Sequence, residues 1–178
     1  TPTASDDDCL VIDVEARRVE PAPPMQQPAP ASVPGGRFIA GSHTDVYGTH
    51  EYRLFVPPGW QGQTLPLVVM LHGCTQNPDD FAAGTGMNDA AREHGVFVLY
   101  PAQTQRANAS RCWNWFKHNH QQRDRGEPAM LAAMTREVMA RYGIDPQRVY
   151  VAGLSAGGAM AAILGDAYPD LFAAVGVH

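Results

Sequence analysis

One serine stands in a setting that favours nucleophilic chemistry. Ser155 is the centre of the stretch Gly-Leu-Ser-Ala-Gly at 153–157, with a glycine two residues to either side. A turn this tight holds the serine in strained backbone, and the glycines let neighbouring backbone pack against it. The backbone N–H of Ala156, at the start of a helix, would then face negative charge that develops next to the hydroxyl. The spacing predicts a catalytic Ser155 with the Ala156 N–H in an oxyanion hole.

The segments on either side of this turn are those that it requires. Residues 149–151 are β-branched and aromatic, which is typical of a buried strand, and residues 158–167 form a small-residue helix. A strand, Gly-x-Ser-x-Gly and a helix in this order make up the nucleophile elbow of α/β-hydrolases. The alternative is a chance match in a Gly/Ala-rich connection, which the flanking strand and helix disfavour.

Composition restricts the class of protein. A length of 178 residues suits one domain with a sizeable core, and a formal net charge of -5 argues against general nucleic-acid binding. There is no apolar run near 18 residues, so we expect no membrane span. The three cysteines, Cys9, Cys74 and Cys112, show no metal-ligand spacing. We therefore expect neither a metal nor another cofactor.

Residues 1–36 differ from the rest of the chain. Three aspartates at 6–8 precede an apolar piece at 10–14, and residues 21–36 are rich in proline, which favours extended structure. We interpret residues 1–36 as an acidic and proline-rich arm or linker. The piece at 10–14 is either a short strand that docks on the domain or on a partner subunit, or part of a partly ordered tail.

The folded domain is expected over residues 37–178. Predicted strands cover 37–40, 47–56, 65–71, 96–100, 149–151 and 172–177, and predicted helices cover 81–94, 127–142 and 158–167. The first two strands read as an antiparallel hairpin or as edge strands, and the later strands alternate with helices. This order predicts a doubly wound, mostly parallel α/β sheet.

Three motifs resemble those of a known family. LHGCTQ at 71–76, RCWNWF at 111–116 and AGLSAGG at 152–158 resemble, in this order, the polyhydroxybutyrate depolymerase-like esterases. These serine α/β-hydrolases also include feruloyl- and acetylxylan-esterase-type members and some polyaspartate hydrolases. The resemblance covers about 37–178 and implies an α/β-hydrolase fold that cleaves carboxylic esters through an acyl-enzyme on Ser155, without a cofactor.

The resemblance also implies how the site is built. The loop after the first central parallel strand would give the second oxyanion donor, the backbone N–H of Cys74 or of Thr75. A disulfide between Cys74 and Cys112 would tie that loop to the RCWNWF segment, whereas in the cytosol both thiols would stay reduced. His72 is expected to shape the loop rather than to act as the catalytic base.

The substrate-binding residues suggested by the motifs come from two segments. We expect contacts from Thr75, Arg111, Trp113 and Trp115, although both tryptophans also suit the core. The segment at 102–125, which contains the RCWNWF motif, also carries five cations and Asp124 as the opposing charge. The cations are Arg106, Arg111, Lys117, Arg123 and Arg125. They form either a positive rim that attracts carboxylate-bearing substrates or an ordinary solvated loop.

α/β-Hydrolases use a catalytic triad of Ser, Asp and His, and the Asp and His of this triad have no clear position in the sequence. They follow the nucleophile along the chain and lie on loops after later strands, but only Asp166, Asp170 and His178 follow Ser155 here. We therefore expect the N-terminal portion of a larger hydrolase, truncated after the strand that follows the nucleophile helix. A complementary C-terminal fragment would carry the Asp and His, and a homo-oligomer is a further candidate assembly.

The favoured function is hydrolysis of carboxylic esters, either polyhydroxyalkanoate and hydroxyacid oligomers or aryl esters. The alternatives are an amide-cleaving hydrolase of an anionic polymer such as polyaspartate, and a non-catalytic hydrolase-fold binding module. Disulfide-compatible cysteines and the proline-rich arm favour a secreted or periplasmic protein, with a cytoplasmic one as the alternative.

Overall fold

The computed structural model describes residues 35–178, so the predicted arm and the candidate strand at 10–14 lie outside the described residues. The strands are β1 (Arg37–Asp45), β2 (Gly48–Val56), β3 (Leu67–Leu71), β4 (Phe97–Pro101), β5 (Val149–Gly153) and β6 (Ala174–Val177). The helices are α1 (Pro78–Thr85), α2 (Met87–His94), the 3-10 turn η1 (His118–His120), α3 (Gly126–Tyr142) and α4 (Ala156–Ala167). None of the helices in 35–178 is long and apolar enough to cross a bilayer.

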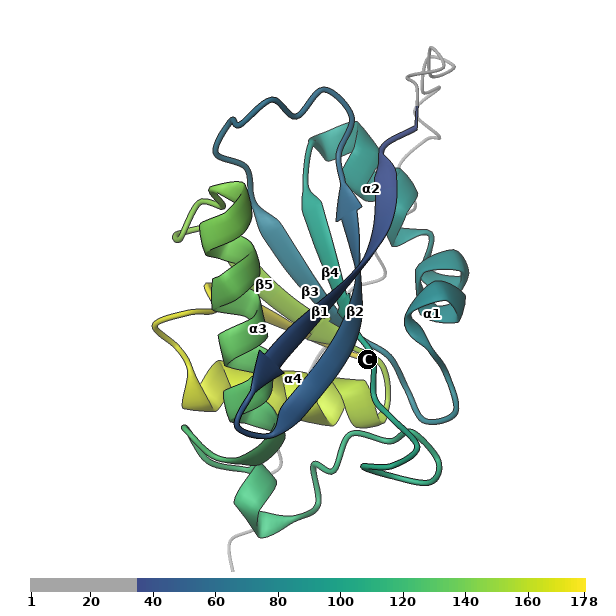
Figure 1. Cartoon of the computed structure of the whole chain (residues 1–178), viewed down its shortest axis with the longest axis vertical. Coiled ribbons are helices and arrows are strands. Elements are labelled where there is room, and N and C mark those ends of the chain that lie inside the picture. The colour runs from purple at the N-terminus through teal and green to yellow at the C-terminus, as the bar shows by residue number, and fades with distance from the viewer. Residues whose placement is uncertain (1–34) are drawn as a thin grey trace, which may run out of the picture. The chain divides into compact units, whose positions relative to one another are not determined.

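The strands form one mixed sheet in the order β1-β2-β4-β3-β5-β6 (Figure 1). Strands β4, β3, β5 and β6 pair in parallel, and β1 and β2 form an antiparallel hairpin that joins the sheet through β4. This arrangement confirms the prediction of a mostly parallel, doubly wound sheet. The carboxyl ends of β3 and β5 meet at one end of the sheet, which is where ligands bind in open α/β folds.

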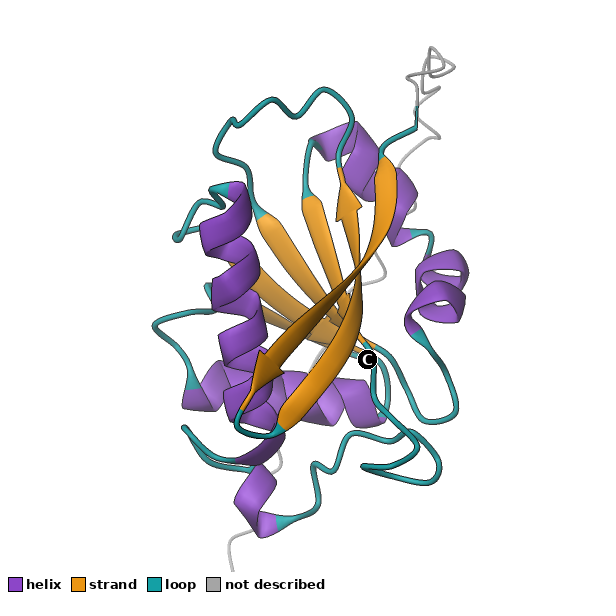
Figure 2. Cartoon of the chain, in the orientation of Figure 1, coloured by secondary structure: helices purple, strands orange, loops and turns teal. Residues whose placement is uncertain are grey.

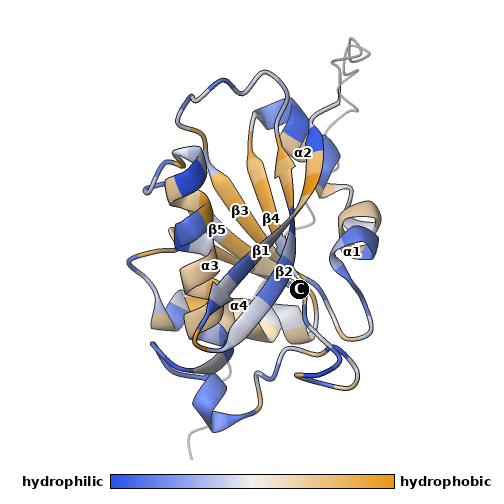
Figure 3. Cartoon of the chain, viewed as in Figure 1, coloured by the Kyte–Doolittle hydropathy of each residue, from blue (hydrophilic) through white to orange (hydrophobic). Residues whose placement is uncertain are grey.

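Helices cover both faces of the sheet. Helices α3 and α4 pack on one face and α1 and α2 on the other (Figures 1 and 2). The larger core lies under α3 and α4, and the smaller one lies under α1 and α2. Successive residues of β3 alternate between the two cores, with Val69 in the larger and Met70 in the smaller. Strands β3, β4 and β5 are accordingly apolar along their length (Figure 3).

The helix predicted over 81–94 is in fact two helices. Gly86 adopts the left-handed conformation (φ 61°) that ends α1, and α2 begins at the next residue. The first helix also starts earlier than predicted, because the Asn77 side chain accepts a hydrogen bond from the Asp80 N–H and caps it. The apolar spacing continues across Gly86, so periodicity alone could not locate this break.

Strand β6 is the edge strand at the end of the sheet opposite to β1. All four residues of β6 are exposed, and among its side chains Val175 and Val177 are 41% and 63% exposed. Next to β6, on the face of α1, lies an apolar cavity of about 450 Å³ whose lining includes Met70, Phe81 and Val177. Helices α1 and α2 contact β2 and β4, and among the elements of residues 35–178 no helix packs over this part of the sheet face.

Candidate active site

The elbow at Ser155 has the strained geometry that the sequence predicts. Ser155 has φ 56° and ψ -119°, a conformation that non-glycine residues rarely adopt, and it is exposed at the junction of β5 and α4. Its N–H donates to the carbonyl of His178 (2.8 Å), and its carbonyl accepts from the Ala159 N–H (3.0 Å). The strained backbone is thus held from β6 on one side and by the first turn of α4 on the other.

The two glycines of the elbow are required by close backbone packing. A Cβ on Gly157 would lie 2.1 Å from the Leu71 carbonyl oxygen and 2.6 Å from that of His72. A Cβ on Gly153 would lie 2.2 Å from the carbonyl oxygen of Gly157. A side chain at Gly157 would therefore push α4 away from the end of β3, and one at Gly153 would push α4 away from the end of β5.

The loop at 72–76, here called the oxyanion loop, passes directly beside Ser155. A Cβ built on Gly73 would lie 3.7 Å from the Ser155 Cβ. The Gly73 N–H donates to the Gln76 side chain (2.8 Å), and the Thr75 N–H donates to the Ser110 carbonyl (2.6 Å). Within residues 35–178 the N–H groups of Cys74 and Ala156 have no acceptor, so these two, and not that of Thr75, are available to a ligand.

His72 shapes this loop and has no free ring nitrogen. Its side chain is buried, with Nδ1 donating to the Gly73 carbonyl (2.7 Å) and Nε2 accepting from the Gln103 N–H (3.1 Å). Burial lowers the pKa of the imidazole below its ordinary value, which keeps the ring neutral. With both nitrogens occupied, His72 cannot take a proton from Ser155 in this arrangement.

The oxyanion loop is held against the segment 102–125 at His72, which bonds Gln103 and Trp113, and by two further tethers. Cys74 and Cys112 form a disulfide bond with their Cα atoms 4.2 Å apart, the pairing that the family resemblance implied. The hydrogen bond from Thr75 to Ser110 is the second tether. The position of the Cys74 N–H therefore depends on how segment 102–125 is itself fixed.

A buried carboxylate fixes that segment, a role that the sequence analysis did not predict. Glu127, 7% exposed at the start of α3, accepts hydrogen bonds from the Asn114 N–H and side-chain amide (both 2.7 Å) and from the Gln103 side chain. The Gln103 amide also donates to the Cys112 carbonyl (3.1 Å). The presence of Asn114 within the RCWNWF motif was the available signal, since a buried Asn needs partners.

The structure separates the predicted substrate contacts. Trp113 is fully buried, and its indole N–H donates to the His72 carbonyl (3.1 Å), so it supports the oxyanion loop from the core and is not a wall of an open cleft. Trp115 is 43% exposed and packs edge-on against Phe116. Thr75 is exposed, and Arg111 is half-buried beside a polar cavity.

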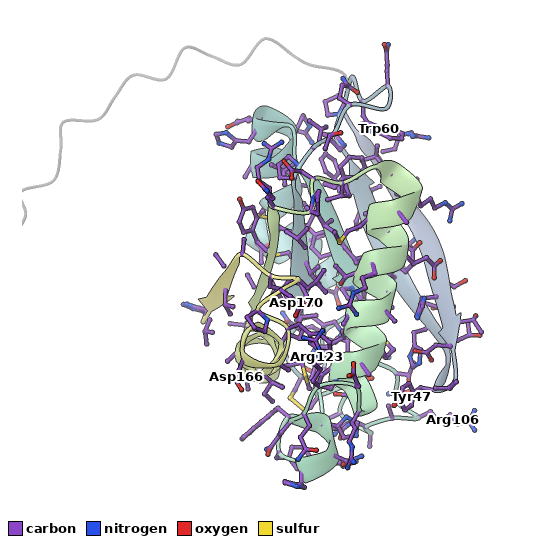
Figure 4. All side chains as sticks on the ribbon, turned by 90° about the vertical axis from the view of Figure 1, so that its left-hand side faces the viewer. Tyr47, Trp60, Arg106, Arg123, Asp166 and Asp170 are labelled. Carbon is purple, nitrogen blue, oxygen red and sulfur yellow. A yellow bond between two sulfur atoms is a disulfide. The ribbon has the colours of Figure 1, made fainter. Side chains whose placement is uncertain are left out.

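The cations of segment 102–125 do not act as one group opposed only by Asp124. Arg123 forms a bidentate ion pair with Asp170 and lies over the ring of Tyr168, beyond the C-terminal end of α4 (Figure 4). This pairing lowers the pKa of the Asp170 carboxyl to about 2. The proposed positive rim therefore loses Arg123, because most of its charge is compensated.

Within residues 35–178, none of the three candidate acid and base residues hydrogen-bonds Ser155 through its side chain. Asp166 is exposed near the far end of α4 (Figure 4), and Asp170 is held by Arg123. His178 contacts the elbow through its backbone. Over residues 35–178, no carboxylate or imidazole hydrogen-bonds the Ser155 hydroxyl, and no three His, Cys, Asp or Glu side chains are placed to hold a metal ion.

Comparison with known proteins places this geometry in a family. The chain is 41% identical over 146 residues to a poly(3-hydroxyalkanoate) depolymerase C of Paucimonas lemoignei, a match that covers 80% of this chain and 35% of that protein. It is 31% identical over 109 residues to a feruloyl esterase B of Neurospora crassa, covering 61% of this chain and 36% of that protein. The chain thus spans about a third of the length of these curated relatives.

Solved structures agree on the fold. An acetyl xylan esterase from Aspergillus awamori superposes with a TM-score of 0.69 at 24% identity, covering 78% of this chain and 51% of that one. This likeness shows the α/β-hydrolase fold. The family model described as esterase PHB depolymerase matches residues 50–178, which include the oxyanion loop, the RCWNWF segment and the elbow. The chain belongs to the PHB depolymerase family of esterases.

Proposed function

We propose that this chain carries the nucleophile and the oxyanion hole of a serine carboxylic ester hydrolase. The observation that carries the proposal is the exposed, strained Ser155 at the start of α4, next to the N–H groups of Cys74 and Ala156, which have no acceptor within residues 35–178. A hydroxyl at a helix N-terminus beside two free amide donors is the arrangement that acyl transfer requires.

The reaction follows from these groups. The Ser155 oxygen attacks the ester carbonyl while a general base takes its proton, and the carbonyl oxygen becomes an oxyanion that accepts hydrogen bonds from Cys74 and Ala156. Collapse of the tetrahedral intermediate breaks the ester C–O bond, and the protonated base gives its proton to the departing alcohol. Water then attacks the acyl-enzyme by the same route in reverse and releases the acid.

The base and its orienting carboxylate come, in this proposal, from a complementary C-terminal segment. Two observations support it: the relatives are about three times as long as the matched region, and Ser155 has no imidazole partner in the described part of the chain. The exposed edge of β6 and the apolar cavity next to it provide the surface on which that segment would pack. Self-association through β6 is the competing use of this edge.

The ester class proposed is that of polyhydroxyalkanoates and hydroxyacid oligomers, with aryl esters as the second class. The support is the depolymerase activity named for the relative that is 41% identical to this chain over 146 residues, together with the feruloyl esterase that is 31% identical over 109 residues. Thr75 in the oxyanion loop and Trp115 in the segment tethered to it are both exposed and are the proposed substrate contacts. Cleavage of an anionic polyamide gains no support from Arg123, which is already paired.

We further propose that the protein works outside the cytoplasm. The disulfide between Cys74 and Cys112 fixes a functional loop, and such bonds persist in oxidising compartments. Counting free thiols in protein taken directly from its source cells tests this, since two free thiols at these positions would contradict an extracytoplasmic location.

The proposed function is tested by hydrolysis of p-nitrophenyl esters with and without the complementary segment. The 178-residue chain alone should be nearly inactive, and the chain with that segment should turn over with Ser155 acylated. Ser155→Ala should lose several orders of magnitude in kcat. Full activity of the Ser155→Ala variant would refute the mechanism, and a complete assembly whose Ser155 cannot be acylated would favour a non-catalytic binding module.

A further inference from the structure

A second cavity lies beside the antiparallel hairpin, where its lining runs from β1 and β2 to the residues that follow the oxyanion loop. It has a volume of about 750 Å³, within the range of small-molecule sites, and is formed by β1, β2, the start of α1 and the residues after β4. Its polar lining residues include Ser42, Glu51, Arg53, Asn77, Asp79 and Arg111. Nothing in the proposed ester-cleaving machinery uses this cavity.

The cavity is fixed close to the oxyanion hole. Arg111 lies between Ser110 and Cys112, two of the residues that tether the oxyanion loop, and its own backbone is held at φ 54°. Because Cys112 lies across the disulfide from Cys74, the Cα of Arg111 is within about 8 Å of that of Cys74. The backbone of Arg111 is therefore held near Cys74, whose N–H is the proposed oxyanion donor.

The charges in the cavity differ in whether they are compensated. Arg53 and Asp79 neutralise each other across the cavity through a 3.1 Å ion pair. Arg111, by contrast, is half-buried, and its side chain makes no ion pair or hydrogen bond with any residue between 35 and 178. The exposed Glu51 is the only lining carboxylate without such a pair in the same part of the chain.

A half-buried guanidinium without a partner is a site for a carboxylate. Planar carboxylates accept two parallel hydrogen bonds from arginine, and partial burial strengthens the pair relative to one in water. A short hydroxyacid oligomer carries one free carboxylate, at the end of a chain whose ester carbonyls are the reacting groups. Interior segments of a polyester carry none.

We propose that this cavity binds the free carboxylate end of a hydroxyacid oligomer through Arg111, while an ester of the same molecule lies at Ser155. This inference rests on the proposed function and gives the site a preference for short, carboxylate-terminated esters over internal polymer segments. Glu51 opposes the ligand charge and limits its affinity. A hydroxyl-rich ligand such as a saccharide would instead use Glu51 as an acceptor.

The test is calorimetric binding of the linear dimer of 3-hydroxybutanoate and of its methyl ester at low salt. The protein is the whole chain with Ser155→Ala, which prevents turnover. The acid should bind about tenfold or more tightly than the methyl ester. Arg111→Gln should remove this preference, Arg111→Lys should keep part of it, and Glu51→Gln should bind the acid as tightly or more tightly.

Arg106→Gln is the matched control, because Arg106 is exposed in the same segment but does not line the cavity. It should leave the preference unchanged. Undetectable binding of the acid, equal binding of acid and methyl ester, or a preference that survives Arg111→Gln would overturn the inference. So would weaker binding of the acid in both Arg111→Gln and Glu51→Gln, which points to a hydroxyl-rich ligand.

Labelling of the unmutated Ser155 by a fluorophosphonate separates this inference from the proposed function. A labelled Ser155 without any carboxylate preference removes the carboxylate site alone. An unlabelled Ser155 in the complete assembly removes the proposed function, whatever the binding data show.

Discussion

Replacing Gly157 by alanine should disable the elbow without touching the nucleophile. The added Cβ would lie 2.1 Å from the Leu71 carbonyl oxygen and 2.6 Å from that of His72. Both neighbours are backbone atoms at the end of β3 and the start of the oxyanion loop, so neither can rotate away. Either α4 or the oxyanion loop must shift, and in both cases the position of Ser155 relative to the Cys74 N–H changes.

The size of the effect follows from the depth of the overlap. Overpacking of a core costs about 1–3 kcal/mol, and contact with fixed backbone places Gly157→Ala at the upper end. A loss of about 3 kcal/mol should lower the melting temperature by about 6–12 °C in a domain of this size. Since a displacement of about 1 Å at a reacting centre costs about 100-fold in rate, labelling of Ser155 by a fluorophosphonate, measured in the complete assembly, should slow by about that factor.

Gly84→Ala is the matched control for this variant. Gly84 lies inside α1, and a Cβ there would meet nothing within 4 Å. This substitution should stabilise the chain by about 0.5–1 kcal/mol, because alanine loses less backbone entropy on folding, and should leave the labelling rate unchanged. If Gly157→Ala instead melts and labels like the unmutated chain, the close packing at the elbow is not what positions Ser155.

Three other perturbations address the parts around the elbow. Glu127→Ala should lower the free energy of unfolding, measured by urea titration, by about 3 kcal/mol, because the buried donors of Gln103 and Asn114 lose their acceptor. A loss below about 1 kcal/mol would contradict this role of Glu127. Because Arg123 depresses the pKa of Asp170 from 3.8 to about 2, the native chain should lose stability as pH falls from about 4 to 2. The urea midpoint of Asp170→Asn should therefore vary less over that pH range than the midpoint of the unmutated chain. Equal acid sensitivity of the two chains would argue against the ion pair in solution. The Cys74–Cys112 disulfide joins residues 38 positions apart, so reducing it should lower the free energy of unfolding by at most about 4 kcal/mol. Reduction should also slow labelling of Ser155 by a fluorophosphonate. An unchanged labelling rate would mean that the disulfide does not position the oxyanion loop.

The elbow could be predicted because its chemistry is local. A strand, two glycines at fixed offsets from Ser155 and a helix all lie within twenty residues, and the backbone clash that excludes larger residues is a property of that short stretch. The mostly parallel sheet followed for a similar reason, since alternating buried strands and helices leave few ways to pack. The helix break at Gly86 was missed because the apolar pattern runs through it.

The surroundings of the site depend on contacts distant in sequence, which residue types alone do not specify. Trp113 could have faced either the cleft or the core, and only its bond to the His72 carbonyl places it in the core. Glu127 looked like an ordinary first-turn helix residue, yet it holds the segment that carries the disulfide. Arg123 seemed free until the fold brought Asp170 beside it, 47 positions along the chain.

The most direct measurement is a crystal structure of the complete protein, chain plus complementary segment, after reaction with a fluorophosphonate. The phosphorus should be bonded to the Ser155 oxygen, with one phosphonyl oxygen about 2.7–3.1 Å from both the Cys74 and the Ala156 backbone nitrogens. An adduct on another residue, or a phosphonyl oxygen turned away from these two N–H groups, would contradict a nucleophile at Ser155 served by this oxyanion hole.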